Sequence, residues 1–283
     1  MPSKLIVKSA SKAGSKTASK STSRRFADAS LLSAQRSGTV LHLRLSRPAK
    51  RNAINDALVQ ALQAAFQNLP KGVHAVLLSG EGEHFCAGLD LNELGGASAF
   101  EGVLHSRMWH AAMDTIQFSP VPVVAVLHGA VVGGGLELAS AAHLRIAEDS
   151  TFYALPEGQR GLFVGGGASV RVPRLIGFTR MTDLMLTGRT LNADEGQEMG
   201  LSHYRTANGA GLAKGLELAH KIAGNAPLSN YAIIQALPRI ADMSRNEGLF
   251  VESLMAAIAQ SDDGAKLRMR AFLDGRASKV KRS

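Results

Sequence analysis

Residues 133–135 are three consecutive glycines that separate an apolar run from the start of a helical pattern. The run 123–127 has the composition of a buried strand, and Leu136 and Glu137 follow the glycines directly. Glycine lets the backbone turn sharply and lets a ligand approach it closely. The first N–H groups of a helix have no partner within it, so they can hold an anionic oxygen. A lone triple glycine can equally be a tight turn that binds nothing.

Residues 84–91, called the first segment below, have the same character and follow a buried strand expected at 73–78; the triple glycine downstream is called the second segment. If amides from both segments point at one carbonyl oxygen, they form an oxyanion hole. Glu137 lies in the first turn of the expected helix, and Glu157 follows a proline in a glycine-rich turn. Taken singly, Glu137 is explained as an acid that interacts favourably with the positive end of the helix dipole, and Glu157 as an exposed acid in a loop. Together they are candidates for an acid–base pair with pKa values pushed apart.

Strand and helix patterns alternate over the first part of the chain, which predicts an α/β fold. We expect Asn55 to cap one helix and Asn192 to cap another that ends at Gly200. The segment 39–45 alternates like a half-exposed strand. Expected strands also occupy 123–127, 144–147 and 151–154, with a helix at 99–118. The stretch 228–273 predicts amphipathic helices that pack on another subunit or cap their own domain.

The net charge of +9 is concentrated at the N-terminus. Seven lysines and arginines precede the first acidic residue, Asp28, among serine, alanine, threonine and glycine. Because such a segment has little to bury, residues 1–30 are predicted to form a disordered basic tail. A solubilising role is favoured over contact with nucleic acid or an anionic surface, and over a transit peptide.

Several classes of protein lack support in this sequence. No apolar run is long enough for a membrane-spanning helix, and Cys86 is a single cysteine, so no intramolecular disulfide can form. A cytoplasmic location is therefore expected, with the mitochondrial matrix as the alternative. His105 and His110 have no acidic partner in a metal-binding pattern, so no metal site is expected. Neither a Gly-x-Ser-x-Gly elbow nor a phosphate-binding loop is present.

At these motifs the chain resembles the crotonase superfamily, the enoyl-CoA hydratase/isomerase family. The resemblance covers roughly residues 40–273, and its motifs occur in order at 47–54, 85–91, 128–139 and 187–201. It implies the crotonase (ClpP/crotonase-like) spiral of ββα units, here over residues 36–225. It also implies a C-terminal helical trimerisation region at 226–275, and hence a homotrimer or a homohexamer.

The resemblance also implies roles, position by position. It places the oxyanion amides at Leu89 and Gly134, and the acid and base at Glu137 and Glu157. Because both glutamates are present, it favours an enoyl-CoA hydratase of fatty acid metabolism, adding water reversibly to a 2-enoyl-CoA thioester. CoA would be part of the substrate, so no separate cofactor is expected. The positions implied for binding the substrate and its CoA are Lys50, Arg51, Ala87, Asp90, Leu91 and Gly133.

The chain departs from the family pattern at two places and leaves alternatives open. Ala142-His143 stands where Cys-Asp is common, and Gly158-Gln159-Arg160 stands where hydratases have apolar residues. Arg160 could keep Glu157 ionised, contact a polar acyl tail or face solvent. An isomerase or an arylpropenoyl-CoA hydratase–lyase would use the same oxyanion hole. An RNA-binding homologue using the basic tail is the alternative of another class, although nucleic acid is not the expected partner.

Overall fold

A computed structural model describes residues 24–25, 31–93, 95–96 and 98–276 of this chain. Its strands form a seven-stranded sheet, in the order β1-β2-β3-β4-β5-β7-β10, and a three-stranded sheet, β6-β8-β9. The large sheet contains β1 (Arg24–Arg25), β2 (Leu32–Ser37), β3 (Val40–Leu45), β4 (Ala75–Gly80), β5 (Val123–Leu127), β7 (Leu144–Glu148) and β10 (Tyr204–Thr206). The small sheet contains β6 (Ala130–Val132), β8 (Phe152–Ala154) and β9 (Leu191–Asn192). The central strands β3, β4, β5 and β7 run parallel, which confirms the α/β class.

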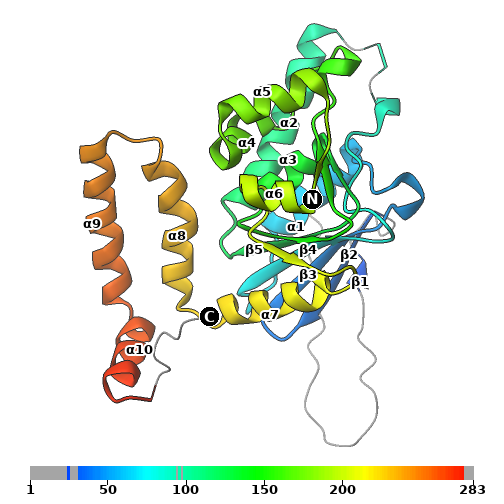
Figure 1. Cartoon of the computed structure of the whole chain (residues 1–283). Helices are drawn as coiled ribbons and strands as arrows, with labels where there is room; N and C mark the ends of the chain where they lie inside the picture. Colours follow the sequence, from blue (N-terminus) through cyan, green and yellow to red (C-terminus); the bar gives the residue numbers. More distant parts are fainter. Residues whose placement is uncertain (1–23, 26–30, 94, 97, 277–283) are drawn as a thin grey trace, which may run out of the picture.

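Helices cover both faces of the large sheet (Figure 1). On one face lie α1 (Asp56–Gln67), α2 (Ala99–Gln117) and α3 (Gly134–Ala141), and on the other lies α7 (Gly211–Ala223). The prediction of a half-exposed strand at 39–45 was therefore only partly right. Val40, on the face expected to meet solvent, is fully buried in a second core cluster beneath α7. That face was assigned to solvent because the covering helix is far away in the sequence.

Local capping signals gave the expected helix boundaries. The Asn55 side chain accepts a hydrogen bond from the Leu58 N–H at 3.1 Å, at the start of α1. Asn192 accepts one from the Glu195 N–H at 2.9 Å, at the start of α6 (Ala193–Met199). Gly200 ends α6 with a φ of 95°, a left-handed conformation that favours glycine.

Several of the shortest strands were not predicted, although the three-residue β8 lies within the strand expected at 151–154. The strands β6, β9 and β10 have two or three residues each, which is too few for an alternating pattern to be recognised. The helix α3 begins at Gly134 rather than at Leu136. Arg24–Arg25, within the predicted tail, pairs with β2, and the rest of residues 1–30 lies outside the described residues.

The helices α4 (Ala168–Ile176) and α5 (Phe178–Thr187) complete the body, and three further helices follow α7. These are α8 (Pro227–Ile240), α9 (Arg245–Ser261) and α10 (Asp263–Leu273), and they stand to one side of the body in Figure 1. The Gln235 side chain of α8 donates to the Phe118 carbonyl at 2.9 Å, and Arg174 pairs with Asp242 at 2.7 Å. None of the described helices is long and apolar enough to cross a membrane.

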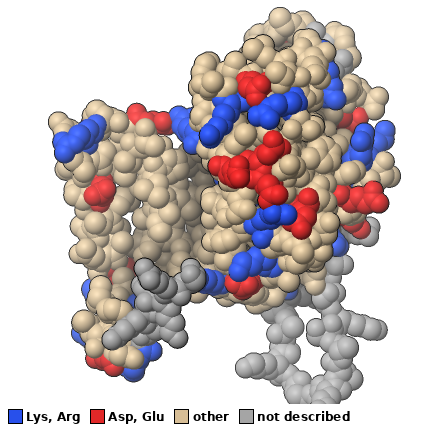
Figure 2. Space-filling view, in the orientation of Figure 1, with Lys and Arg blue, Asp and Glu red and all other residues tan. Residues whose placement is uncertain are grey.

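The three C-terminal helices, called the C-terminal arm below, expose many apolar side chains. In Figure 2 much of the visible surface of α8 and α9 carries no charged side chain. The large apolar side chains that are exposed on the arm are Tyr231, Ile233, Leu237, Leu249, Phe250, Leu254, Ile258, Leu267, Met269, Phe272 and Leu273. A surface of this kind favours packing against another protein surface over contact with water.

Candidate active site

A small cavity of about 70 Å³ lies where the two glycine-rich segments meet. The first segment contributes part of its wall, the helix α3 contributes another part, and the loop after β8 closes it. The residues around it are Ala87, Gly88, Leu89, Leu91, Val132, Gly133, Gly134, Glu137, Glu157, Arg160, Leu162, Phe163, Val164 and Gly165. Residues expected from sequence to act together therefore surround one space, although up to 70 positions separate them along the chain.

The two segments are joined by backbone hydrogen bonds. Cys86 donates to the Ala130 carbonyl at 2.9 Å and accepts from the Val132 N–H at 3.2 Å. A methyl group built on Gly135 would collide with the Cys86 carbonyl oxygen, so only glycine allows this crossing. The fully buried Cys86 supports the crossing, and burial raises the pKa of its thiol to about 12, which opposes a nucleophilic role.

The amides of Leu89 and Gly134 meet at the cavity. A methyl group built on Gly134 would lie 3.4 Å from the Leu89 nitrogen. Among the described residues, neither N–H group donates a hydrogen bond. Two free backbone donors at one cavity can hold a single oxygen that gains negative charge.

The loop that includes Arg47 and Asn52 supports the first segment. The fully buried Asn52 side chain accepts from the Arg47 N–H at 2.9 Å and donates to the His84 carbonyl at 2.7 Å. Arg47 pairs with Asp90 at 3.0 Å, and the Ala87 N–H donates to the Arg51 carbonyl at 3.0 Å. The Asp90 carboxylate, expected to contact substrate, is thus engaged in fixing the loop.

The other positions implied for binding CoA fall into two groups. Ala87, Leu91 and Gly133 line the cavity. Lys50 and Arg51 lie outside it, exposed on the loop that leads to the first segment. The two groups are linked through the bond between Ala87 and Arg51.

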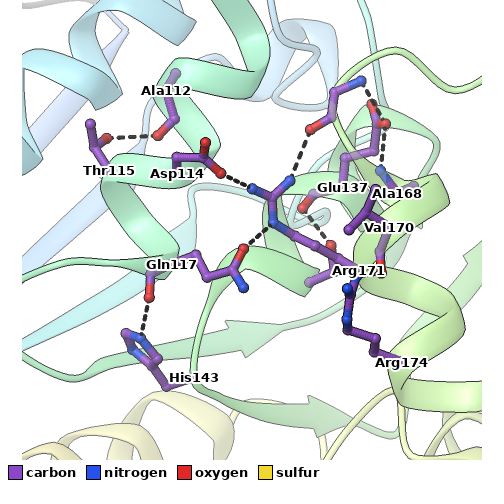
Figure 3. A network of polar contacts seen from close by, with 12 residues as sticks. Ala112, Asp114, Thr115, Gln117, Glu137, His143, Ala168, Val170, Arg171 and Arg174 are labelled. Carbon is purple, nitrogen blue, oxygen red and sulfur yellow. Dashed lines mark hydrogen bonds and ion pairs between the residues drawn. The ribbon is translucent and has the colours of Figure 1, made fainter. Parts of the chain in front are cut away.

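Glu137 is 4% exposed and lies in the first turn of α3. Its Oε1 accepts hydrogen bonds from the Gly166 N–H at 2.7 Å and the Ala168 N–H at 3.1 Å (Figure 3). Burial raises the pKa of this carboxyl, while the backbone donors and the positive charge of Arg171 oppose the rise. These partners stabilise the ionised form that a base requires.

Glu157 has different surroundings. A methyl group built on Gly133 would lie 2.6 Å from its Oε1, so the carboxyl packs against the second glycine segment. Its Oε2 is buried and has no hydrogen-bond partner among the described residues. Burial raises the pKa of Glu157 and the charge of Glu137 raises it further, against the lowering effects of its own backbone N–H and of Arg160. The idea that Arg160 keeps Glu157 ionised is therefore opposed by the larger effect of burial.

The sequence alone did not predict the position or the role of two residues at this site. Trp109, in α2, is 3% exposed and lies against Gly134 and Gly166. Arg171 was given no role from the sequence, because nothing near it in the chain links it to Glu137.

His105, for which no acidic metal-binding partner was expected, pairs with Asp56 at 2.8 Å. Among the described residues, no three histidine, cysteine or acidic side chains are grouped as a metal site would need.

The site can therefore hold an oxyanion, accept a proton at one carboxyl and supply a proton from the other. This capability comes from two free amides and from two carboxyls whose pKa values are both raised by burial but which have different hydrogen-bond partners and neighbouring charges. Such an arrangement suits reactions that pass through the enolate of an acyl group.

Known proteins that are similar to this chain indicate the family to which it belongs. A family profile described as enoyl-CoA hydratase/isomerase matches residues 35–282. The chain is 31% identical over 249 residues to the enoyl-CoA hydratase EchA19 of Mycobacterium tuberculosis, covering 86% of this chain and 93% of that one. It is 30% identical over 243 residues to a peroxisomal Delta(3,5)-Delta(2,4)-dienoyl-CoA isomerase of Arabidopsis thaliana, covering 80% and 87%.

Solved structures agree with the sequence comparison. The crystal structure of a proposed enoyl-CoA hydratase from Rhodopseudomonas palustris superimposes with a TM-score of 0.85 at 55% identity, covering 87% of this chain and 96% of that one. The expected crotonase fold, with two sheets and C-terminal helices, is thereby confirmed. Together with the profile match, this shows that the chain belongs to the crotonase superfamily's enoyl-CoA hydratase/isomerase family.

Proposed function

We propose that this protein is an enoyl-CoA hydratase, which adds water reversibly, in syn fashion, to the double bond of a 2-enoyl-CoA thioester. The observation that carries the proposal is the presence of two carboxyls, Glu137 and Glu157, at one cavity with the free amides of Leu89 and Gly134. A hydratase must remove one proton from water and add another to carbon, and two carboxyls supply both functions.

In the proposed reaction, the thioester oxygen lies between the Leu89 and Gly134 N–H groups. Both carboxyls orient the water, and ionised Glu137 takes a proton from it as its oxygen bonds to Cβ. The electron pair of the double bond moves toward the thioester, and the two amides stabilise the resulting enolate oxygen. Protonated Glu157 then delivers its proton to Cα, which gives the 3-hydroxyacyl thioester. A proton passes back from Glu137 to Glu157 through solvent to complete the cycle.

The CoA portion is proposed to lie along the loop that bears Lys50 and Arg51. Both side chains are basic and exposed there, as contact with phosphate groups would require. The acyl portion would enter between Leu91 and the segment containing Leu162 and Phe163, which is partly exposed at the cavity.

Double-bond isomerisation is the second candidate, favoured by the similarity to a dienoyl-CoA isomerase. An isomerase moves a proton between two carbons through a dienolate of the thioester, so it needs the same oxyanion amides. A hydratase–lyase acting on an arylpropenoyl-CoA would hydrate first and then cleave the chain. Each of these three reactions leaves a product of different mass or double-bond position.

The test is product analysis by mass spectrometry with a panel of 2-enoyl-CoA and 3-enoyl-CoA thioesters, both aliphatic and aromatic. We expect a gain of one water on 2-enoyl thioesters. A shifted double bond without a mass change would assign an isomerase, and a shortened acyl chain would assign a hydratase–lyase. If folded protein turned over none of them, the hydratase proposal would be wrong.

We also propose that the C-terminal arm mediates assembly into a homotrimer or homohexamer, with the arm's apolar side chains buried between subunits. Light scattering coupled to size-exclusion chromatography should then give a mass of about three or six times the 29.8 kDa chain. Charged substitutions at Phe250 and Leu254, which are 65% and 44% exposed, should lower that mass. A monomeric wild type would contradict this assembly.

We further propose that the protein acts in fatty acid metabolism in the cytoplasm, with the mitochondrial matrix as the alternative location.

A further inference from the structure

Arg171, in α4, is a buried cation whose guanidinium donates to two side chains and one backbone carbonyl in the part of the chain described. It is 8% exposed, and its Nη2 pairs with the Asp114 carboxylate at 2.6 Å. Its Nε donates to the Gln117 side chain at 2.6 Å, and its Nη1 donates to the Gly166 carbonyl at 3.2 Å (Figure 3). The guanidinium therefore joins α2 to the loop 166–168.

That loop is the one that holds Glu137. The N–H groups of Gly166 and Ala168 donate to Glu137, while the Gly166 carbonyl accepts from Arg171. Gly167 has a φ of 105°, and a methyl group built on it would collide with the Arg171 guanidinium. The loop is thus fixed between the cation on one side and the carboxylate on the other.

The partners of Arg171 are themselves anchored. Gln117, which accepts from Arg171, also uses its backbone carbonyl to bond to His143 at 2.9 Å. His143 in turn accepts from the Val123 N–H at 2.9 Å, at the start of β5. Arg171 is consequently connected to the central sheet, and a shift of its guanidinium would be resisted by several elements.

We propose that Arg171 is a positioning residue for the proposed reaction: it holds the loop 166–168 so that Glu137 faces the cavity, and its positive charge favours the ionised form of Glu137. This inference rests on the proposed function for its catalytic consequence. Its structural and electrostatic consequences concern Glu137 alone and can be measured without turnover.

The charged and titratable groups around Glu137, the loop 166–168 and Arg171 come from three directions. Arg171 lies on α4, as does Arg174, whose charge acts on Arg171; on α2 lie Asp114, the partner of Arg171, and His110, which packs near Gly167. Glu157 lies on the loop after β8. Among these, Arg171 is the cation whose charge lowers the pKa of Glu137, and Asp114 is the anion paired with that cation.

The experiment compares three variants and one control variant by the pH titration of Glu137, followed by NMR of protein labelled with carboxyl-¹³C glutamate. The Glu137 signal is assigned by its absence in Glu137→Gln. In Arg171→Gln we expect the titration to move to higher pH, because the cation that favours the carboxylate is gone. In Asp114→Asn we expect it to move to lower pH, because the cation is no longer offset by its partner.

Arg171→Lys separates charge from geometry. A lysine keeps the positive charge, but its single ammonium group cannot donate hydrogen bonds to Asp114, Gln117 and the Gly166 carbonyl as the planar guanidinium does. We expect the Glu137 titration to stay near the wild-type pH while kcat falls by up to about 100-fold through misplacement of the base. In Arg171→Gln, the acidic limb of the kcat profile should move to higher pH together with the NMR titration.

Arg174→Gln is the matched control, since it removes an exposed arginine from the same helix, where Arg174 pairs with Asp242. It should leave both the titration and kcat near wild type. The inference would be overturned if Glu137 titrated at the wild-type pH in Arg171→Gln, or if Asp114→Asn moved it in the same direction as Arg171→Gln. A wild type without hydratase turnover would reject the proposed function, and the NMR titration would still decide the role of Arg171.

Discussion

Replacing Glu157 with glutamine is expected to lower kcat for hydration by about 10²- to 10⁴-fold, the usual contribution of a general acid or base. Glutamine has the shape of glutamic acid but no proton that it can deliver to Cα. The loss should be large because Glu157 is the carboxyl whose surroundings favour a retained proton: it is half-buried, lies near the charge of Glu137, and has a buried, unpaired Oε2. Steady-state kinetics on the best thioester from the panel would measure it.

The matched control is Glu198→Gln, which makes the same change at an exposed position of α6. It should retain wild-type kcat. If Glu137 and Glu157 act as one unit, Glu137→Gln should cost a similar factor, and the double variant should be little worse than either single variant. Retention of most of the activity in Glu157→Gln would mean that the proton reaches Cα from another group.

Replacing Gly134 with alanine is expected to lower kcat by about 10²- to 10³-fold, as the loss of one oxyanion donor does. The added methyl group would lie 3.4 Å from the Leu89 nitrogen and 3.2 Å from the Trp109 ring, so it crowds the place where the oxygen would be held. Gly134 is the first residue of α3, where alanine is a good helix former. Activity should therefore fall much more than stability.

The control for this change is Gly102→Ala. Gly102 lies in α2, and a methyl group built on it meets nothing within 4 Å. Thermal unfolding followed by circular dichroism should show a similar melting temperature for both variants, while kcat falls in Gly134→Ala alone. Wild-type kcat in a folded Gly134→Ala protein would show that the thioester oxygen does not lie between the two amides.

Much of the fold could be predicted because its signals are local. Asn55, Asn192 and Gly200 mark helix ends through contacts with residues only a few positions away. The apolar run of β5 and the glycines after it are likewise readable in a short window. In contrast, Val40 could not be predicted as buried, because its burial depends on α7. The strand β10 pairs with β7 across more than 50 residues, and its three residues carry no pattern of their own.

For the candidate site, the sequence by itself determined which residues have the right chemistry: two glycine-bearing segments and two glutamates in an order that resembles a known family. Only the tertiary structure decided how Glu137 and Glu157 differ, since burial, backbone donors and neighbouring charges come from separate parts of the chain. It also brought Arg171 to Glu137 through the loop 166–168. The physical reason is that solvation and electrostatic interactions depend on distances in space, which cannot be read from the separation of residues along the chain.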